Sequence, residues 1–529
     1  MRSATSWVAS RSVEIVFSLL IVSAFIYLMR ITDDAYFHTF DDWGLILRSQ
    51  TLRGTLQPYN DHLSITILAI YRMLIEAFGF SYTPFMVVGL LCLAAVPVAF
   101  FVTTRRWLGS PLAAILALSL LGFSNLEFYP AVLNHYLVLV GAIICAAALN
   151  RDARADWMLA GGLLLALSAA GGGVAVAVAC VVHNICSRAV LRRWLAVLVP
   201  GALWFTWWLV EGLGARSDWR PAVRPSASEA FDYAREVAMT PFTHLGLGNS
   251  AIAVALALLF FARGLVWLRN GLAAGSNFLA WTCALCVWSI GLAYGRGSRG
   301  ITETLQPFHG VFFRYQLLSL GFALLAMVPR HPLQWPNRFS LTSGPLRMTT
   351  AAVVVLAVGG IQGIAVREAV EGRARWMEAS GRTTEATLAL LQLEPNAMPD
   401  EVVVGGHPGL RASEVRSLVR RYGSPYETGS AQADRVLLDL GVVSARSVPL
   451  RDFSCSRVTG VISWLPGPRP YLYLWSEGST TTVEVRRFDS DWIPVARLAP
   501  GTAASLDLPT LQARTPWKVQ AVGACRRSP

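Results

Sequence analysis

The stretch Ile31–Ser64, ITDDAYFHTFDDWGLILRSQTLRGTLQPYNDHLS, follows the first apolar run of the chain and is unusually rich in acidic groups. It contains two carboxylate pairs, Asp33–Asp34 and Asp41–Asp42, and a polar cluster, Asn60–Asp61–His62. The sequence on both sides is apolar enough for a bilayer, where ionisable groups are costly and usually mark a functional site. We therefore expect this stretch to be an active-site loop on the outer face of a polytopic membrane protein.

The composition of the whole chain supports this membrane assignment. Of its 529 residues, 54% are hydrophobic and 15% are charged, whereas a soluble protein carries about 25% charged residues. The net charge of +12 comes almost entirely from arginine, since Lys518 is the only lysine. These arginines stand between apolar runs, where they set the orientation of membrane spans. The basic balance therefore does not indicate nucleic-acid binding.

The first apolar run predicts a retained span with a cytoplasmic N-terminus. Arg2 and Arg11 precede Val13–Met29, which is long enough to cross a bilayer and is followed by no small-residue cleavage site. Further apolar runs are Ile65–Phe80, Phe85–Val102, Pro111–Phe123, Ala131–Leu149, Trp157–Ala170, Gly172–Val182, Ala189–Val210, Ile252–Phe261, Phe278–Tyr294, Val311–Val328 and Thr350–Ile364.

The run Ile65–Phe80 decides the topology of everything after it. If it crossed the membrane, Arg105–Arg106 and the later basic loops would lie outside. If it lies in the membrane interface, as its Arg72 and Glu76 favour, all of these loops lie inside. The second choice predicts roughly eleven spans and an extracytoplasmic C-terminus, with two short spans joined at Gly171–Gly173.

The polar C-terminal part predicts a separate outer domain. A helical pattern covers Arg367–Leu393, and short alternating runs punctuated by Gly, Pro, Ser and Asp follow it. Such spacing is typical of a β-sandwich or jelly roll. We therefore divide the chain into a transmembrane domain, 1–366, and an extracytoplasmic domain, 367–529. Cys455 and Cys525 are the only cysteines of this outer part, and such a pair in an exported domain suggests a disulfide.

Asp41–Asp42 are the strongest candidates for chemistry. Adjacent carboxylates can act as a general base, position a nucleophile or bind a hard divalent cation such as Mg²⁺ or Mn²⁺. A solvated acidic loop is the alternative. Phe40 and Trp43 bracket the pair, a short helical stretch follows it, and His62 comes about twenty residues later, before the interfacial segment.

This arrangement resembles the GT-C superfamily of membrane glycosyltransferases, which includes protein O-mannosyltransferases, lipid A aminoarabinose transferases and mycobacterial arabinosyltransferases. In that superfamily an acidic pair in the first outer loop supplies the catalytic carboxylate, and a Lys or His precedes the next helical segment. Asp41 and Asp42 match the acidic positions. His62 matches the basic position, here within NDHLS and without the Pro-Pro of the family pattern.

A second region, Gly295–Gln316, resembles the Gly-Arg…Arg-Tyr pattern of some GT-C-like bacterial membrane proteins. Arg296, Arg299 and Arg314 stand beside a predicted span on the outer side, and Tyr315 would lie at headgroup level. Arginine binds phosphate bidentately. The resemblance implies that this loop, together with His62, holds the phosphate of a polyprenyl-phosphate sugar donor. Interfacial anchoring by Arg and Tyr is the alternative.

Lesser candidates lie in other predicted outer loops. Glu127, Tyr129, Asn134 and His135 would line the same cavity or form a satisfied boundary cluster. The loop 211–246 would contribute to acceptor binding. Gly171–Gly173 lacks the Lys-Ser/Thr of a phosphate-binding loop, so we interpret it as a tight turn between two spans.

The resemblance implies an inverting sugar transfer on the outer face of a bacterial inner membrane, with a cell-envelope glycan, lipid or protein as acceptor. Asp41 would be the general base, with Asp42 supporting it or holding a metal. The competing class is a non-enzymatic transporter or scaffold of envelope polysaccharide assembly. An O-antigen polymerase or ligase is a third possibility, but it would not depend on a first-loop carboxylate.

Overall fold

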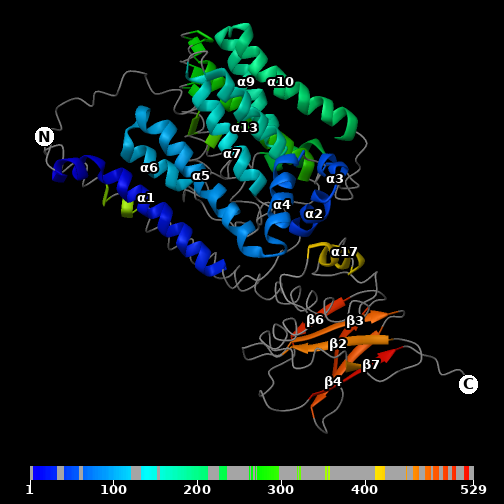
Figure 1. Ribbon diagram of the computed structural model, residues 1–529. Coiled ribbons are helices and arrows are strands. Elements are labelled where there is room, and N and C mark those ends of the chain that lie inside the picture. Colours follow the sequence, from blue (N-terminus) through cyan, green and yellow to red (C-terminus); the bar gives the residue numbers. More distant parts are fainter. Residues whose placement is uncertain are drawn as a thin grey trace, which may run out of the picture. The chain divides into compact units, whose positions relative to one another are not determined.

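The computed structural model describes residues 4–32, 41–58, 63–120, 133–151, 155–212, 226–234, most of 261–296, short pieces within 318–357, 412–422 and the strands between 448 and 523 (Figure 1). Its helices are α1 (Ala4–Thr32), α2 (Asp41–Ser49), α3 (Leu52–Leu56), α4 (Ile65–Phe78), α5 (Tyr82–Leu108), α6 (Ser110–Ser119), α7 (Leu133–Leu149), α8 (Asp156–Ala169), α9 (Gly173–Ser187), α10 (Leu191–Trp207), the π-helix η3 (Trp208–Gly212), α13 (Ser276–Arg296) and α17 (Ala412–Tyr422).

The described residues are mainly helical, as predicted, and their apolar helices support the predicted membrane protein. Among the described residues, three helical segments are long and apolar enough to cross a bilayer: Arg11–Arg30, Tyr82–Leu108 and Leu191–Gly212. Five shorter apolar helices accompany them: α6, α7, α8, α9 and the first part of α13. The number of spans and their orientation stay predictions.

Helix α4 is short and buries one stripe of residues, and its predicted place in the membrane interface stays a prediction. Its 14 residues extend about 21 Å, less than the hydrocarbon core of a bilayer. Leu68, Tyr71 and Ile75 form a buried stripe at helical spacing. Arg72 and Glu76 lie exposed on its surface and form an ion pair with a 3.0 Å separation between Nε and Oε1.

Helices α7, α8, α9, α10 and α13 pack into one layered bundle (Figure 1). Helices α7 and α8 cross closely at two glycines. A Cβ at Gly141 would lie 2.6 Å from the carbonyl oxygen of Gly162, and a Cβ at Gly162 would lie 2.8 Å from Ile144 Cγ2. Small residues allow this close backbone approach, which is how apolar helices associate in lipid.

Helices α8 and α9 are joined by a tight turn, as predicted at Gly171–Gly173. The turn is closed by a hydrogen bond from the Gly173 N–H to the Ala170 carbonyl (3.0 Å). A Cβ at Gly173 would lie 2.3 Å from the carbonyl oxygen of Ala166. The first turn of α9 therefore contacts the last turn of α8 so closely that only glycine fits.

Gly173→Ala is expected to lower the stability of the protein by about 1–3 kcal/mol, because the new methyl group forces the two helices apart. Gly161→Ala is the matched control. Gly161 lies on the exposed face of α8 with nothing within 4 Å of its Cβ position, so this change should be neutral or stabilise by up to about 1 kcal/mol. Thermal unfolding in detergent compares the two variants, and equal midpoints would contradict the packing described here.

The chain divides into two compact units. The first comprises Met1–Ile31, Thr51–Ile70 and Met86–Arg373, and the second comprises Thr32–Gln50, Tyr71–Phe85 and Ala374–Pro529. The second unit therefore contains α2 and the α4–α5 turn as well as the C-terminal part. The predicted boundary at 366/367 and the predicted helix Arg367–Leu393 lie outside the described residues.

The strands all belong to the second unit. They are β1 (Val448–Pro449), β2 (Arg457–Ser463), β3 (Tyr471–Glu477), β4 (Thr481–Arg487), β5 (Ile493–Leu498), β6 (Ala503–Asp507) and β7 (Trp517–Gly523). They form two antiparallel sheets of order β1-β2-β3-β6 and β5-β4-β7. Cys455 and Cys525 lie outside the described residues.

Candidate functional site

Helix α2 begins at the acidic pair, with Asp41 as its first residue. Its buried residues, Asp42, Trp43, Leu45, Ile46 and Ser49, recur at helical spacing and form one face. At its other end, the Ser49 hydroxyl and the Gln50 side-chain amide both donate to the carbonyl of Ile46, at 2.7 and 2.9 Å. These bonds satisfy one of the carbonyls that a helix C-terminus leaves without an intrahelical partner.

Asp42 is completely buried, and a tyrosine from α4 holds its carboxyl group. The Tyr71 hydroxyl donates to Asp42 Oδ1 at 2.5 Å, and both side chains have no exposed surface. Tyr82, at the start of α5, is close enough to interact electrostatically with Asp42. A buried carboxyl group is costly unless it is hydrogen-bonded, so the bond from Tyr71 explains how the interior accepts Asp42.

Two aromatic pairs involve Tyr71 and the residue that follows Asp42. The Trp43 ring, fully buried, lies 5.7 Å from that of Phe80, and the Tyr71 ring meets Phe85 edge-on at 5.0 Å. Such aromatic pairs contribute stability beyond their buried area. The first two turns of α2 are thus fixed against the end of α4 and the start of α5.

The two residues of the acidic pair begin α2. Asp41 is the first residue of α2, and the buried Asp42 follows it. The N-terminus of a helix also favours a negatively charged side chain. Tyr71 thus holds Asp42 in the interior, and the assignment of Asp41 as the general base stays a prediction.

Tyr71→Phe is expected to destabilise the protein by about 1.5–3 kcal/mol, because it removes a hydrogen bond to a buried carboxyl group. Thermal unfolding in detergent measures this loss. In an Asp42→Leu background, which has no acceptor for the Tyr71 hydroxyl, the same change should cost clearly less, since residues that share one interaction are not additive. Additive losses would show that Tyr71 stabilises the protein by some other contact.

The remaining predicted donor-site residues fall largely outside the described part of the chain. His62, Arg299, Arg314 and Tyr315 lie there, as do Asp33–Asp34. Arg296 is described only as backbone, as the last residue of α13. The other end of α13 is fixed beside the end of α7, where Asn277 Nδ2 donates to Asn150 Oδ1 at 2.7 Å. Arg296 therefore lies at the opposite end of α13 from this contact.

Two of the lesser candidates are described at the start of α7. Asn134 and His135 are half-buried, and Asn134 Oδ1 accepts a hydrogen bond from the His135 main-chain N–H at 2.8 Å. Glu127 and Tyr129 lie outside the described residues. Whether these four side chains line a common cavity stays a prediction.

In the predicted acceptor loop, the acidic residue Glu229 caps the start of a helix. Its Oε2 accepts hydrogen bonds from the Ser226 main-chain N–H (2.7 Å) and hydroxyl (2.8 Å), while its own N–H donates to that hydroxyl (3.3 Å). These contacts form a capping box at the start of the helical residues 227–234. The bonds from the Ser226 main chain and then its hydroxyl lower the pKa of Glu229, so it stays ionised near neutral pH.

A second polar cluster lies at the ends of α7, α8 and α10. Arg193 Nε is 3.1 Å from Oδ1 of the buried Asp156, and its Nη2 donates to the carbonyls of Arg151 (2.6 Å) and Ala148 (3.4 Å). Arg192 approaches Asp156 Oδ2 at 3.5 Å. One guanidinium thus satisfies the carbonyls that end α7 and the carboxylate that begins α8.

Sequence reasoning assigned the arginines of this cluster to topology alone and did not single out Tyr71, Tyr82, Gln50 or Asp156. A usable signal was present for Tyr71, because it lies on the apolar stripe of α4, four residues before Ile75. A tyrosine within such a stripe needs a polar partner when buried.

Comparison with known proteins adds no identification, because the chain matches no protein-family model, no curated protein and no solved structure.

Proposed function

We propose that this protein is a membrane glycosyltransferase of the GT-C type. It would transfer a sugar from a polyprenyl-phosphate donor to a cell-envelope glycan, lipid or protein on the outer face of a bacterial inner membrane. The observation that supports this best is the start of α2, where Tyr71 holds the buried Asp42 and leaves Asp41 at the helix N-terminus. Fixing a carboxylate through a neighbour is how enzymes preorganise a general base.

In the proposed reaction, the Asp41 carboxylate removes the proton of the acceptor hydroxyl as its oxygen attacks the anomeric carbon of the donor sugar. The bond between that carbon and the phosphate oxygen breaks, and the polyprenyl phosphate leaves with the electron pair. General-base catalysis of this kind contributes about 10²–10⁴-fold to a rate. Attack from the face opposite the phosphate inverts the anomeric configuration.

Negative charge accumulates on the departing phosphate, and the proposal assigns its stabilisation to Arg296 and Arg314, with Tyr315 and His62 as further donors. Guanidinium groups bind phosphate oxygens bidentately and are worth most where water is excluded. The support in the structure is limited to Arg296, which ends the apolar helix α13.

A divalent cation, Mg²⁺ or Mn²⁺, is also proposed, with Asp41 as its ligand. Asp42 suits this role less, because its Oδ1 is already bonded to Tyr71 and the side chain is fully buried. No group of three or more His, Cys, Asp or Glu side chains that fits a metal ion occurs among the described residues. A bound metal ion would neutralise part of the negative charge, and the proposed roles of Asp41, Arg296 and Arg314 do not require it.

The proposed architecture has roughly eleven spans, a cytoplasmic N-terminus and an outer β-sandwich domain that caps the site or binds the growing glycan. Helices α8 and α9 support the short paired spans that this count requires, since they form a hairpin closed at Gly173.

The test is sugar transfer by the purified full-length protein in detergent or liposomes. Radiolabelled polyprenyl-phosphate hexoses and pentoses are supplied with envelope extracts as acceptor, with Mg²⁺, with Mn²⁺ or with EDTA. Transfer that depends on the protein and inverts the anomeric centre supports the proposal. Donor binding without transfer under every condition would instead support a transporter or scaffold of polysaccharide assembly.

A further inference from the structure

The C-terminal part of the chain contributes a helix, α17, to the same compact unit as α2. Val415 and Leu418 are buried, whereas Arg420 and Arg421 are exposed, so α17 presents one apolar face at helical spacing. Its last residue is Tyr422, and the contacts of this tyrosine reach elements that precede it by more than three hundred residues.

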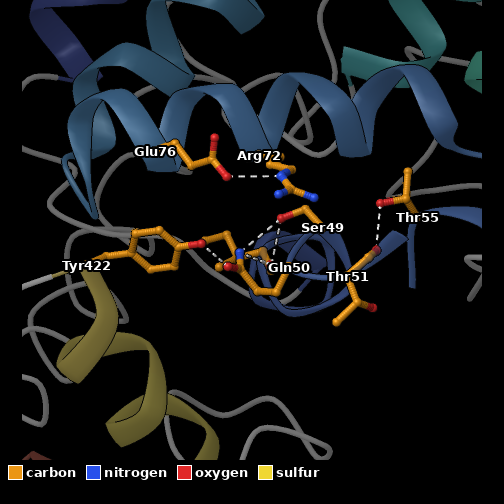
Figure 2. A network of polar contacts seen from close by, with 8 residues as sticks. Ser49, Gln50, Thr51, Thr55, Arg72, Glu76 and Tyr422 are labelled. Atoms are coloured by element: carbon orange, nitrogen blue, oxygen red, sulfur yellow. Dashed lines mark hydrogen bonds and ion pairs between the residues drawn. The ribbon is translucent and has the colours of Figure 1, made fainter. Parts of the chain in front are cut away.

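The Tyr422 hydroxyl donates to Oε1 of Gln50, the residue that follows α2 (Figure 2). The amide nitrogen of Gln50 donates in turn to the Ile46 carbonyl at 2.9 Å and to the Ser49 hydroxyl at 3.2 Å. One side chain therefore closes the C-terminus of α2 and binds α17 at the same time.

The end of α17 also meets the turn between α4 and α5. Gly79 has a φ of +57°, and a Cβ placed there would lie 3.4 Å from the main-chain oxygen of Tyr422. Helix α4 in turn supplies Tyr71 to Asp42. Helix α2 is thus held near its start by Tyr71 and at its end, through Gln50, by Tyr422.

We propose that α17 is a positioning element for α2, with Tyr422 acting through Gln50 to hold the helix that carries Asp41–Asp42. A nine-residue helix is not stable in isolation, so its orientation depends on contacts at both ends. The C-terminal part then completes the acidic site rather than forming an appendage to it. The catalytic meaning of this contact rests on the proposed function, but the contact itself does not.

Hydrogen–deuterium exchange of the full-length protein in detergent tests the contact without any substrate. Tyr422→Phe should speed exchange of the α2 amides about fivefold, the effect of losing one hydrogen bond that resists local opening. Ser417→Ala is the matched control, because it removes one exposed hydroxyl from the same helix, where it bonds only the Glu414 carbonyl (2.7 Å). Equal exchange in the two variants would overturn the proposal.

A double variant tests whether the effect passes through Gln50. In a Gln50→Leu background, whose α2 amides already exchange faster, adding Tyr422→Phe should change the rates by less than about 1.5-fold. A full fivefold effect in that background would show that Tyr422 does not act through Gln50.

Transfer kinetics separate this proposal from the proposed function. Tyr422→Phe should lower kcat about threefold to tenfold with the donor KM within twofold, because α2 carries the base and the donor phosphate is bound elsewhere. A rise in KM with unchanged kcat would overturn the positioning role. A wild-type protein that transfers no sugar would refute the proposed function and leave the exchange result standing.

Discussion

Sugar transfer by Asp41→Asn should fall about 10²–10⁴-fold below that of the wild type, because the variant lacks the base that accepts the acceptor proton. Asn has nearly the same size as Asp, and the hydrogen bond of Tyr71 goes to the neighbouring Asp42. The thermal unfolding midpoint should therefore stay within the range of a surface substitution, about ±0.5 kcal/mol in stability. The radiolabel assay gives the rate, and thermal unfolding in detergent verifies the fold.

Asp42→Asn is the informative control, since it alters the adjacent carboxylate. The substitution replaces one carboxyl oxygen by an NH₂ group, which places N–H donors in the interior beside Tyr71. The dominant effect should therefore be a stability loss of about 1–3 kcal/mol. The two variants thus separate chemistry from positioning. Equal transfer by Asp41→Asn and wild type would remove Asp41 from the mechanism and direct attention to Asp42 or Asp33.

The sequence could predict the membrane character and the location of the acidic helix because these depend on local composition. Runs of apolar residues predict helices regardless of their partners, and α5, α7 and α13 follow the predicted runs closely. The turn at Gly171–Gly173 was also predictable, since three glycines between apolar runs indicate a tight connection. The requirement for glycine at Gly173 was not predictable, because it depends on the position of Ala166 in the folded protein.

The burial of Asp42 against Tyr71 could not be predicted, because Asp41 and Asp42 are identical in type and adjacent. Which carboxylate turns inward depends on the angle at which α2 meets α4, and that angle depends on Trp43, Phe80 and Tyr71. The bond between Tyr422 and Gln50 was equally inaccessible, since it joins residues 372 positions apart. Long-range pairs of this kind leave no periodic signal in a single sequence.

Arg193→Met is expected to destabilise the first unit by about 3–5 kcal/mol, the loss measured when one partner of a buried ion pair is removed. Asp156 is 3% exposed, so its carboxylate would lose its closest cation, and the Arg151 and Ala148 carbonyls would lose their bonds to Nη2. Thermal unfolding in detergent should show a clear fall in the midpoint. This expectation does not depend on any catalytic function.

The neighbouring Arg192 is the matched control, because it has the same side chain as Arg193 but is far more exposed. The Arg192 side chain is 68% exposed, against 14% for Arg193, although both approach the same carboxylate. Solvent screens an exposed pair, so Arg192→Met should cost no more than about 1 kcal/mol. Adding Asp156→Leu to Arg193→Met should recover part of the loss, because the double variant no longer buries an uncompensated charge. Equal losses for the two single variants would show that the Asp156 site is more hydrated than its burial indicates.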